Sequence, residues 1–371
     1  VKRRMRAELG EDWASKFKNF DKFLKNQIKN EWNIPGIAVA IFDSNKILHT
    51  YISGYSNLKT KKKLKVTDKF LIASCSKSIF CAAIASLIEK KKIPNIWNMT
   101  LEEVWSKNIH PEFKKVKVKQ LAMHNSGIDG PNDEVEYTNN IKKYYKIENK
   151  LNKLDGIEAR KQLTNIVLKM KPLYKPGSKF EYSNWGYGIL GAIIEKITKQ
   201  HYAEIINNEI MKPLNIDANF EKLFYGENFV NGHYSIWWDK KLKNKLTPLK
   251  KNQFINPLIE SPAGETWMSI LDCAKYCQSY LKTLNKQKSI LKSSIVKYLT
   301  KKNFEDYGYG WFINNRNHVY HGGSYFHTTT HFHMIPEKNI GIVLSVNTNF
   351  YHKWLIIKEF LKFVLVKPAK I

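Results

Sequence analysis

The sequence has little arginine for a chain of such strong positive charge. Its 371 residues include 61 lysines and arginines against 33 acidic residues, which gives a net charge of +28, yet only five of the basic residues are arginine. Because nucleic-acid surfaces usually favour arginine, we expect no nucleic-acid partner. The charge still predicts a peripheral, salt-dependent attraction to anionic cell-wall polymers or membranes.

Cysteine is scarce, and long apolar runs are absent. The four cysteines include no CxxC pair, which argues against a zinc module. Cys75 and Cys81 have apolar neighbours and are predicted to be buried thiols, while Cys273 and Cys277 have a spacing that seldom forms a disulfide. Residues 354–366 are apolar but carry interrupting charges, so they are predicted to form an amphipathic helix and not a membrane span.

Strand patterns lie at both ends of the chain and helical patterns lie between them. Residues 34–57 read as two strands joined by a turn at Asp43-Ser44-Asn45, and the lysine-rich residues 59–66 read as an exposed loop or edge. Helical patterns dominate residues 74–216, another helix begins after residue 261, and strand patterns return from residue 307. This order predicts an α/β (α+β) chain with one sheet built from both termini and an inserted helical subdomain.

We expect a single catalytic domain with a short leading segment. The predicted boundaries are 1–13 for the N-terminal segment, 14–73 and 245–371 for the α/β subdomain, and 74–244 for the helical subdomain.

The pair Ser74 and Lys77 stands at the head of an apolar stretch. S-x-x-K recurs five more times in this lysine-rich chain, so the spacing alone means little. After Ser74, however, apolar residues cover nearly the whole circumference of the predicted helix, so the helix should be buried. Lys77 would share a face with Ser74, and burial should lower its pKa toward that of a base that activates serine. The alternative is that Ser74 caps the helix and Lys77 reaches solvent.

Two further motifs follow in order. The chain has Tyr-Ser-Asn at residues 182–184, within KPGSKFEYSNWGYGILGAIIEKITK, and His-Gly-Gly at residues 321–323. With IPGIAVAIFDSNK, VKQLAMHNSGIDG, SPAGETWMSILDCAKY and YGYGW, this set resembles the serine β-lactamase and penicillin-binding protein family over residues 20–365. The relatives include class C β-lactamases, DD-peptidases, D-aminopeptidases and esterases. The resemblance implies an antiparallel sheet flanked by helices.

The resemblance also implies roles for individual residues in acyl transfer. Ser74 would be the nucleophile, and Lys77 and Tyr182 would share the proton transfers. Asn184 would hold Lys77 and a substrate amide. No cofactor or metal is expected.

The resemblance further implies an oxyanion hole made from two backbone N–H groups, those of Ser74 and Ser324. Gly322 and Gly323 would let the substrate backbone approach the strand.

His321 replaces the lysine of the K-T-G motif. A histidine is largely neutral at pH 7, so we expect this chain to be a less efficient β-lactamase than relatives with lysine, and peptides, amides or esters stay open as substrates. We also expect activity that depends on a substrate carboxylate to strengthen below about pH 6.5. The residues after the His-Gly-Gly motif depart from the family pattern, which keeps open a penicillin-binding or wall-binding protein with negligible turnover.

Other histidines have less specific interpretations. His331 and His333 would share one strand face and could form a metal pair, although a hydrogen-bonded or exposed face is the simpler interpretation. His124 is interpreted as a structural turn residue. The chain begins at Val1 without methionine, so we expect a trimmed start and, because the relatives mostly act outside the cytoplasm, a periplasmic or otherwise extracytoplasmic location.

Overall fold

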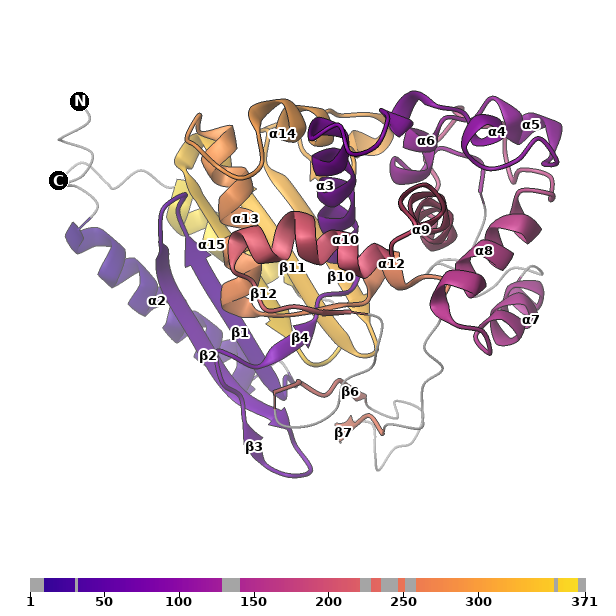
Figure 1. Cartoon of the computed structure of the whole chain (residues 1–371). Helices are drawn as coiled ribbons and strands as arrows, with labels where there is room; N and C mark the ends of the chain where they lie inside the picture. Colours follow the sequence, from indigo (N-terminus) through magenta and orange to yellow (C-terminus); the bar gives the residue numbers. More distant parts are fainter. Residues whose placement is uncertain are drawn as a thin grey trace.

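A seven-stranded antiparallel sheet organises the molecule (Figure 1). The computed structural model describes residues 10–30, 33–128, 141–220, 228–234, 246–250, 258–349 and 353–365. The sheet has the order β3-β2-β1-β12-β11-β10-β9. Its strands are β1 (Gly36–Phe42), β2 (Ile47–Asn57), β3 (Lys62–Lys63), β9 (Phe312–Ile313), β10 (Val319–Tyr325), β11 (Thr328–Ile335) and β12 (Ile340–Val346).

The two ends of the chain meet at the centre of this sheet. Strand β1 pairs with β12 in antiparallel register, with Ile37 opposite Val346. The predicted sheet from both termini is therefore confirmed, as are the turn between β1 and β2 and the lysine-rich edge at β3.

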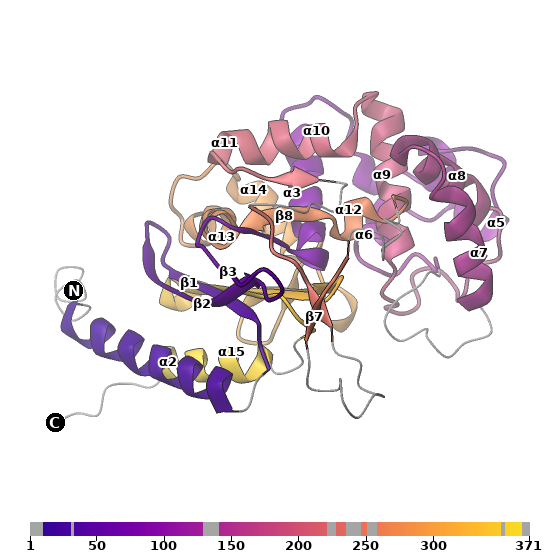
Figure 2. The same cartoon turned by 90° about the horizontal axis from the view of Figure 1, so that it is seen from below.

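Alternating side chains of β1 face two separate cores, as the two-residue period of a strand requires. Ile37 and Val39 pack with Phe20 of α2 (Gly10–Asn30) and Phe360 of α15 (Lys353–Leu365). Figure 2 shows these two helices together on one side of the sheet. The opposite face packs against α13 (Ile270–Leu284) and the core around α3 (Ser76–Glu89) and α14 (Ser293–Leu299).

Most remaining helices lie between two short strands in sequence. Strand β4 (Lys69–Leu71) pairs with β8 (Thr266–Ser269), which also pairs with β5 (Asn219–Phe220). Strands β6 (His233–Tyr234) and β7 (Thr247–Pro248) form a separate pair. The helices in this part are α4 (Leu101–Val104), α5 (Pro111–Lys114), α6 (Val118–Ala122), α7 (Ile141–Leu151), α8 (Gly156–Val167), α9 (Asn184–Thr198), α10 (Tyr202–Ile206), a π-helical turn (Asn207–Met211) and α11 (Lys212–Leu214).

The chain between α11 and β9 differs in detail from the predicted pattern. The segment predicted to begin a helix at residue 261 forms a single turn, α12 (Ser261–Gly264), and then β8 before α13 starts. The aromatic segment from residue 307 becomes a strand only at β9, and Gly310, which precedes it, has a positive φ of 76°. The subdomain boundaries stay a prediction, and the one at 244/245 borders residues outside the described part of the chain.

The predictions for the cysteines and the C-terminal segment are confirmed. All four cysteines are buried free thiols. Residues 353–365 form α15, whose apolar side chains pack on the sheet. Within the described ranges, no helix is both long and apolar enough to cross a membrane.

Three histidines are buried beneath α15, on the sheet face away from α3. His331 and His333 share this face, with ring centroids 5.8 Å apart, and His318 Nδ1 lies 3.1 Å from His333 Nε2. His331 is fully buried against Trp354, and neither of its ring nitrogens has a hydrogen-bond partner among the described residues. Burial, the neighbouring His333 and Lys353 hold the pKa of His331 well below its usual range.

This burial makes the fold sensitive to acid. A histidine whose pKa is lowered by folding stabilises the folded state above its unfolded pKa near 6.5, and this stability is lost as pH falls below that value. We expect His331→Leu to reduce the slope of unfolding free energy against pH by up to about 1.4 kcal/mol per pH unit between pH 6.5 and 4.5. Urea denaturation of both proteins at several pH values measures this slope; parallel curves would show that His331 does not titrate in this way.

Candidate active site

Ser74 lies in a tight 3-10 turn that leads directly into a buried helix. The turn spans Ala73–Cys75 and continues into α3, which matches the predicted position of Ser74. Ala73 has a φ of 48°, a left-handed conformation that non-glycine residues adopt with strain and that recurs at functional sites. The hydroxyl of Ser76 donates to the Ala73 carbonyl at 2.7 Å and holds this turn.

Lys77 is fully buried, with 0% of its surface exposed. Its Nζ lies 3.0 Å from Ser74 Oγ, and it donates to Asn184 Oδ1 at 2.8 Å and to the Ala263 carbonyl at 2.9 Å. The structure therefore excludes the alternative in which Lys77 reaches solvent. The three partners come from the turn before α3, the start of α9 and the turn α12.

These partners dictate how the amine can act. The oxygens of Asn184 and Ala263 can only accept hydrogen bonds. In its neutral form the amine has two hydrogens and one lone pair, so donating to these two oxygens would leave the lone pair for Ser74 Oγ, whereas the charged form would donate to all three oxygens. A lone pair aimed at the serine hydroxyl is what removal of its proton requires. The predicted lowering of the Lys77 pKa stays a prediction.

The Tyr-Ser-Asn motif is held in place by His124. The ring nitrogen Nδ1 of His124 accepts from the Ser183 N–H at 3.1 Å, and the His124 carbonyl accepts from the Glu181 N–H at 2.7 Å. Ser183 then caps α9 by accepting from the Gly186 N–H at 3.1 Å, so Asn184 starts the helix. His124 has a φ of 55° and is 1% exposed, which agrees with its interpretation as a structural turn residue.

Tyr182 packs between His124 and Lys77. Its ring centroid lies 4.1 Å from that of His124 and 4.8 Å from Lys77 Nζ. Burial is the largest cause that holds the pKa of His124 well below its usual range, so His124 is a neutral acceptor beside Tyr182. The role of Tyr182 in proton transfer stays a prediction.

Strand β10 passes directly against the Ser74 turn. A Cβ added at Gly323 would lie 2.5 Å from the Ser74 backbone nitrogen and 2.6 Å from the Ile72 carbonyl oxygen. The thiol of Cys75 also reaches the His321 carbonyl, at 3.5 Å. Ser324, the next residue of β10, is exposed and places its Oγ 3.0 Å from Thr329 Oγ1. The backbone N–H groups of Ser74 and Ser324 remain the predicted oxyanion hole.

The expectation that carboxylate-dependent activity strengthens below about pH 6.5 assumes an ordinary imidazole pKa, and that assumption is wrong for His321. The ring is 1% exposed, and burial is the largest cause that lowers its pKa to about 3. Its Nδ1–H donates to the Gly322 carbonyl at 2.7 Å, so its Nε2 accepts from the Tyr307 hydroxyl at 3.1 Å. A contact between the His321 ring and a substrate stays a prediction, and it requires the ring to exchange one of these partners.

The structure brings Ser74, Lys77 and Asn184 into contact and sets Tyr182 beside them. Sequence reasoning missed the Ala263 carbonyl, the support that His124 gives to Ser183, and the bond from Tyr307 to His321. A carbonyl has no residue-type signature, although Ala263 and Tyr307 both lie in segments that carry the family resemblance. Within the described residues, no group of three or more histidine, cysteine, aspartate or glutamate side chains has the arrangement of a metal site.

Comparison with known proteins gives the family of this chain and two of its relatives. The model of the Beta-lactamase family matches residues 20–356. Protein flp of Staphylococcus aureus is 28% identical over 329 residues, which cover 85% of this chain and 60% of that protein. An unguisins hydrolase of Aspergillus campestris is 22% identical over 269 residues, covering 69% of this chain and 46% of the hydrolase. This chain therefore spans less than two thirds of either relative.

A solved structure shares the fold. The octameric penicillin-binding protein homologue from Pyrococcus abyssi superimposes with a TM-score of 0.75 at 24% identity, covering 94% of this chain and 77% of that chain. The predicted antiparallel sheet with flanking helices is thus confirmed by a known structure as well as by the strand pairing.

The two glycines of β10 offer a matched test of this packing. Gly323→Ala drives a methyl group into backbone atoms that cannot give way, whereas a Cβ at Gly322 would first meet the His331 side chain at 3.1 Å. We expect Gly323→Ala to reduce the unfolding free energy by about 1–3 kcal/mol and Gly322→Ala by less. Chemical denaturation compares them, and equal losses would contradict the close approach of β10 to Ser74.

Proposed function

This chain belongs to the Beta-lactamase family, and we propose that it is a serine hydrolase of the β-lactamase and DD-peptidase type that works through an acyl-enzyme on Ser74. The proposed substrates are D-amino-acid peptides, as for a D-Ala-D-Ala carboxypeptidase, or related amides, esters or β-lactams. Family members act on small-molecule or peptide substrates.

The geometry of the Lys77 amine is the observation that carries this proposal. Nζ lies 3.0 Å from Ser74 Oγ and also donates to Asn184 Oδ1 and to the Ala263 carbonyl, an arrangement in which a neutral amine could turn its lone pair to Ser74. The neutral amine would take the Ser74 proton while Oγ bonds to the substrate carbonyl carbon. The proton would pass, through Lys77 and Tyr182, to the leaving group as the carbon–leaving-group bond breaks. Water would then hydrolyse the acyl-enzyme.

The state of His321 narrows the proposed substrate. A neutral, internally bonded histidine supplies no positive charge where the family motif has a lysine. Substrates that need a fixed cation for a terminal carboxylate are therefore less suited than peptides, amides or esters with an uncharged group at this position.

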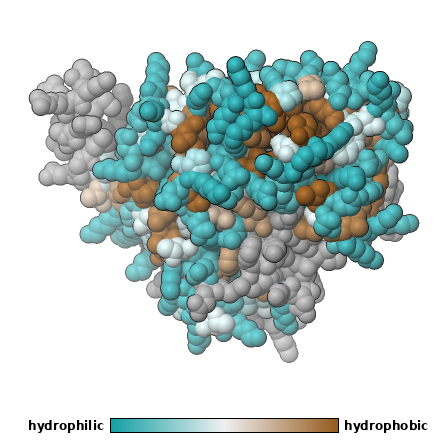
Figure 3. Space-filling model, in the orientation of Figure 1, coloured by the Kyte–Doolittle hydropathy of each residue, from teal (hydrophilic) through white to brown (hydrophobic). Residues whose placement is uncertain are grey.

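The alternative function is a penicillin-binding or cell-wall-binding protein with negligible turnover. The observation that favours it is the departure of the residues after the His-Gly-Gly motif from the family pattern, since acylation could proceed while these residues fail to complete the cycle. We further propose a peripheral attraction to anionic wall polymers or membranes, based on the net charge of +28. An extracytoplasmic location is proposed because the relatives mostly act outside the cytoplasm. Figure 3 shows hydrophilic side chains over much of one face of the molecule, with hydrophobic areas between them.

The first test is the intact-protein mass after exposure to a fluorescent penicillin and to a D-aminoacyl ester, followed over time. We expect a covalent adduct on the native protein and none on Ser74→Ala. Release of the acyl group with repeated consumption of reagent supports the hydrolase, whereas a permanent adduct supports the binding-protein alternative. Equal labelling of both proteins would remove Ser74 from the mechanism.

A second test concerns pH. Since the pKa of His321 is lowered to about 3, the ring stays neutral from pH 5 to 8 and cannot favour a carboxylate in that range. We expect the ratio of kcat/KM for a peptide with a free C-terminal carboxylate to that for its C-terminal amide to stay constant within about twofold over this range. If the ring became charged within this range, this ratio would rise as the pH falls. A rise of about tenfold between pH 8 and 5 would therefore contradict a permanently neutral His321.

A further inference from the structure

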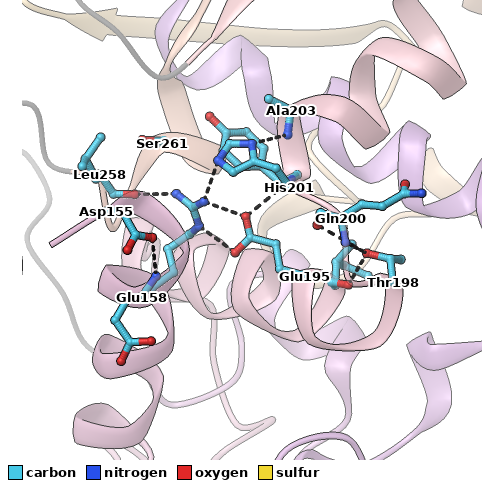
Figure 4. A network of polar contacts seen from close by, with 12 residues as sticks. Asp155, Glu158, Glu195, Thr198, Gln200, His201, Ala203, Leu258 and Ser261 are labelled. Carbon is cyan, nitrogen blue, oxygen red and sulfur yellow. Dashed lines mark hydrogen bonds and ion pairs between the residues drawn. The ribbon is translucent and has the colours of Figure 1, made fainter.

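A second buried charged cluster lies beside the candidate active site, in the helical part of the chain (Figure 4). Arg160 of α8 is fully buried and donates from Nε and Nη2 to the two carboxylate oxygens of Glu195 on α9, at 3.0 and 2.6 Å. Its Nη2 also lies 3.1 Å from His201 Nε2, and its Cζ lies 4.8 Å from the Tyr202 ring centroid.

Stability alone is a poor explanation for this cluster. A buried ion pair gives little net stabilisation over apolar side chains of similar volume, because both ions lose their hydration. A fork-shaped guanidinium, in contrast, fixes its partners in direction as well as distance. The contact that Arg160 makes through Nη1 therefore indicates what the cluster positions.

That contact leads towards the candidate active site. Arg160 Nη1 donates to the Leu258 carbonyl at 2.8 Å. From Leu258 the chain runs into the hydrogen-bonded turn α12, in which the Ala263 N–H donates to the Glu260 carbonyl at 2.7 Å and the Glu265 N–H donates to the Ser261 carbonyl at 3.0 Å. These bonds make the segment from residue 258 to 265 a compact unit that can pass a displacement of one end to the other.

Two glycines of α9 let this segment lie close against the helix. A side chain at Gly188 would overlap the Ile259 carbonyl oxygen, and a Cβ at Gly191 would lie 2.8 Å from the Pro262 ring and 3.2 Å from Arg160 Cδ. The segment thus rests on α9, is held at Leu258 by Arg160, and ends with the Ala263 carbonyl on Lys77 Nζ at 2.9 Å.

We infer that Arg160 is a positioning residue for the reaction: by holding the Leu258 carbonyl, it places the Ala263 carbonyl that orients the Lys77 amine toward Ser74. The expected effect on kcat rests on the proposed function. The expected effect on the position of the Ala263 carbonyl does not. Without Arg160, the Ala263 carbonyl would shift, and the Lys77 amine would lose one of the acceptors that orient it.

The test replaces the whole ion pair, so that no unpaired charge stays buried. In Arg160→Met with Glu195→Met, we expect the crystallographic distance from Lys77 Nζ to the Ala263 oxygen to exceed hydrogen-bond reach, about 3.5 Å. For an ester substrate we expect kcat to fall by about tenfold or more, within the range of a misplaced general base, while KM stays within about twofold. Arg160→Lys retains the charge opposite Glu195 and serves as a second variant, since lysine lacks the fork that also reaches Leu258.

A matched control removes another buried carboxylate. Glu209 is also buried, and it bonds to Ser86 and pairs with Lys90 and Lys92, which are 46% and 55% exposed and can return to solvent. Glu209→Met should therefore lower stability without changing kcat or the Lys77–Ala263 distance.

The outcomes separate the two claims. An unchanged distance and an unchanged kcat in a folded Arg160 variant would overturn the positioning role. An equal loss of kcat in Glu209→Met would assign the effect to general destabilisation and also overturn it. If the native protein catalyses no reaction that Ser74→Ala abolishes, the proposed function is refuted. The crystallographic distance from Lys77 Nζ to the Ala263 oxygen would still decide the role of Arg160.

Discussion

The buried amine of Lys77 is the constraint on which the arrangement of the candidate active site depends. A lysine with no exposed surface must satisfy its nitrogen inside the protein. The Asn184 side chain, the Ala263 carbonyl and the Ser74 hydroxyl are among the groups that do so here. The need to satisfy one nitrogen thus explains why three segments far apart in the sequence converge at the start of α3.

Close backbone contacts make this convergence feasible. Around the start of α3, glycines stand where any side chain would collide with the backbone: a Cβ at Gly310 would lie 2.5 Å from the Ser78 nitrogen, and one at Gly323 would lie 2.5 Å from the Ser74 nitrogen. Because the nucleophile turn is enclosed by backbone, small shifts of β10 or α12 would move reacting groups directly. Supporting residues such as His124, and by our inference Arg160, therefore matter although they lie outside the reacting set.

The sequence predicted the parts of this structure that depend on residue type and order. The burial of α3, the meeting of the two termini in one sheet, and the grouping of Ser74 with Lys77 and Asn184 all followed from apolar patterns and ordered motifs. The neutral state of His321 did not, because it depends on the Tyr307 hydroxyl and on burial. The contact of the Ala263 carbonyl with Lys77 could not be predicted for a similar reason, because every residue has a carbonyl and only the fold selects which one faces Lys77. Strand β8 was missed because four residues between two helices carry too short a pattern.

The most direct test of the central claim is a neutron crystal structure of the native protein near neutral pH. The account predicts two deuterons on Lys77 Nζ, directed at Asn184 Oδ1 and the Ala263 oxygen, with the Ser74 deuteron pointing to Nζ. A third deuteron on Nζ, directed at Ser74 Oγ, would contradict a lysine that stands ready as the base.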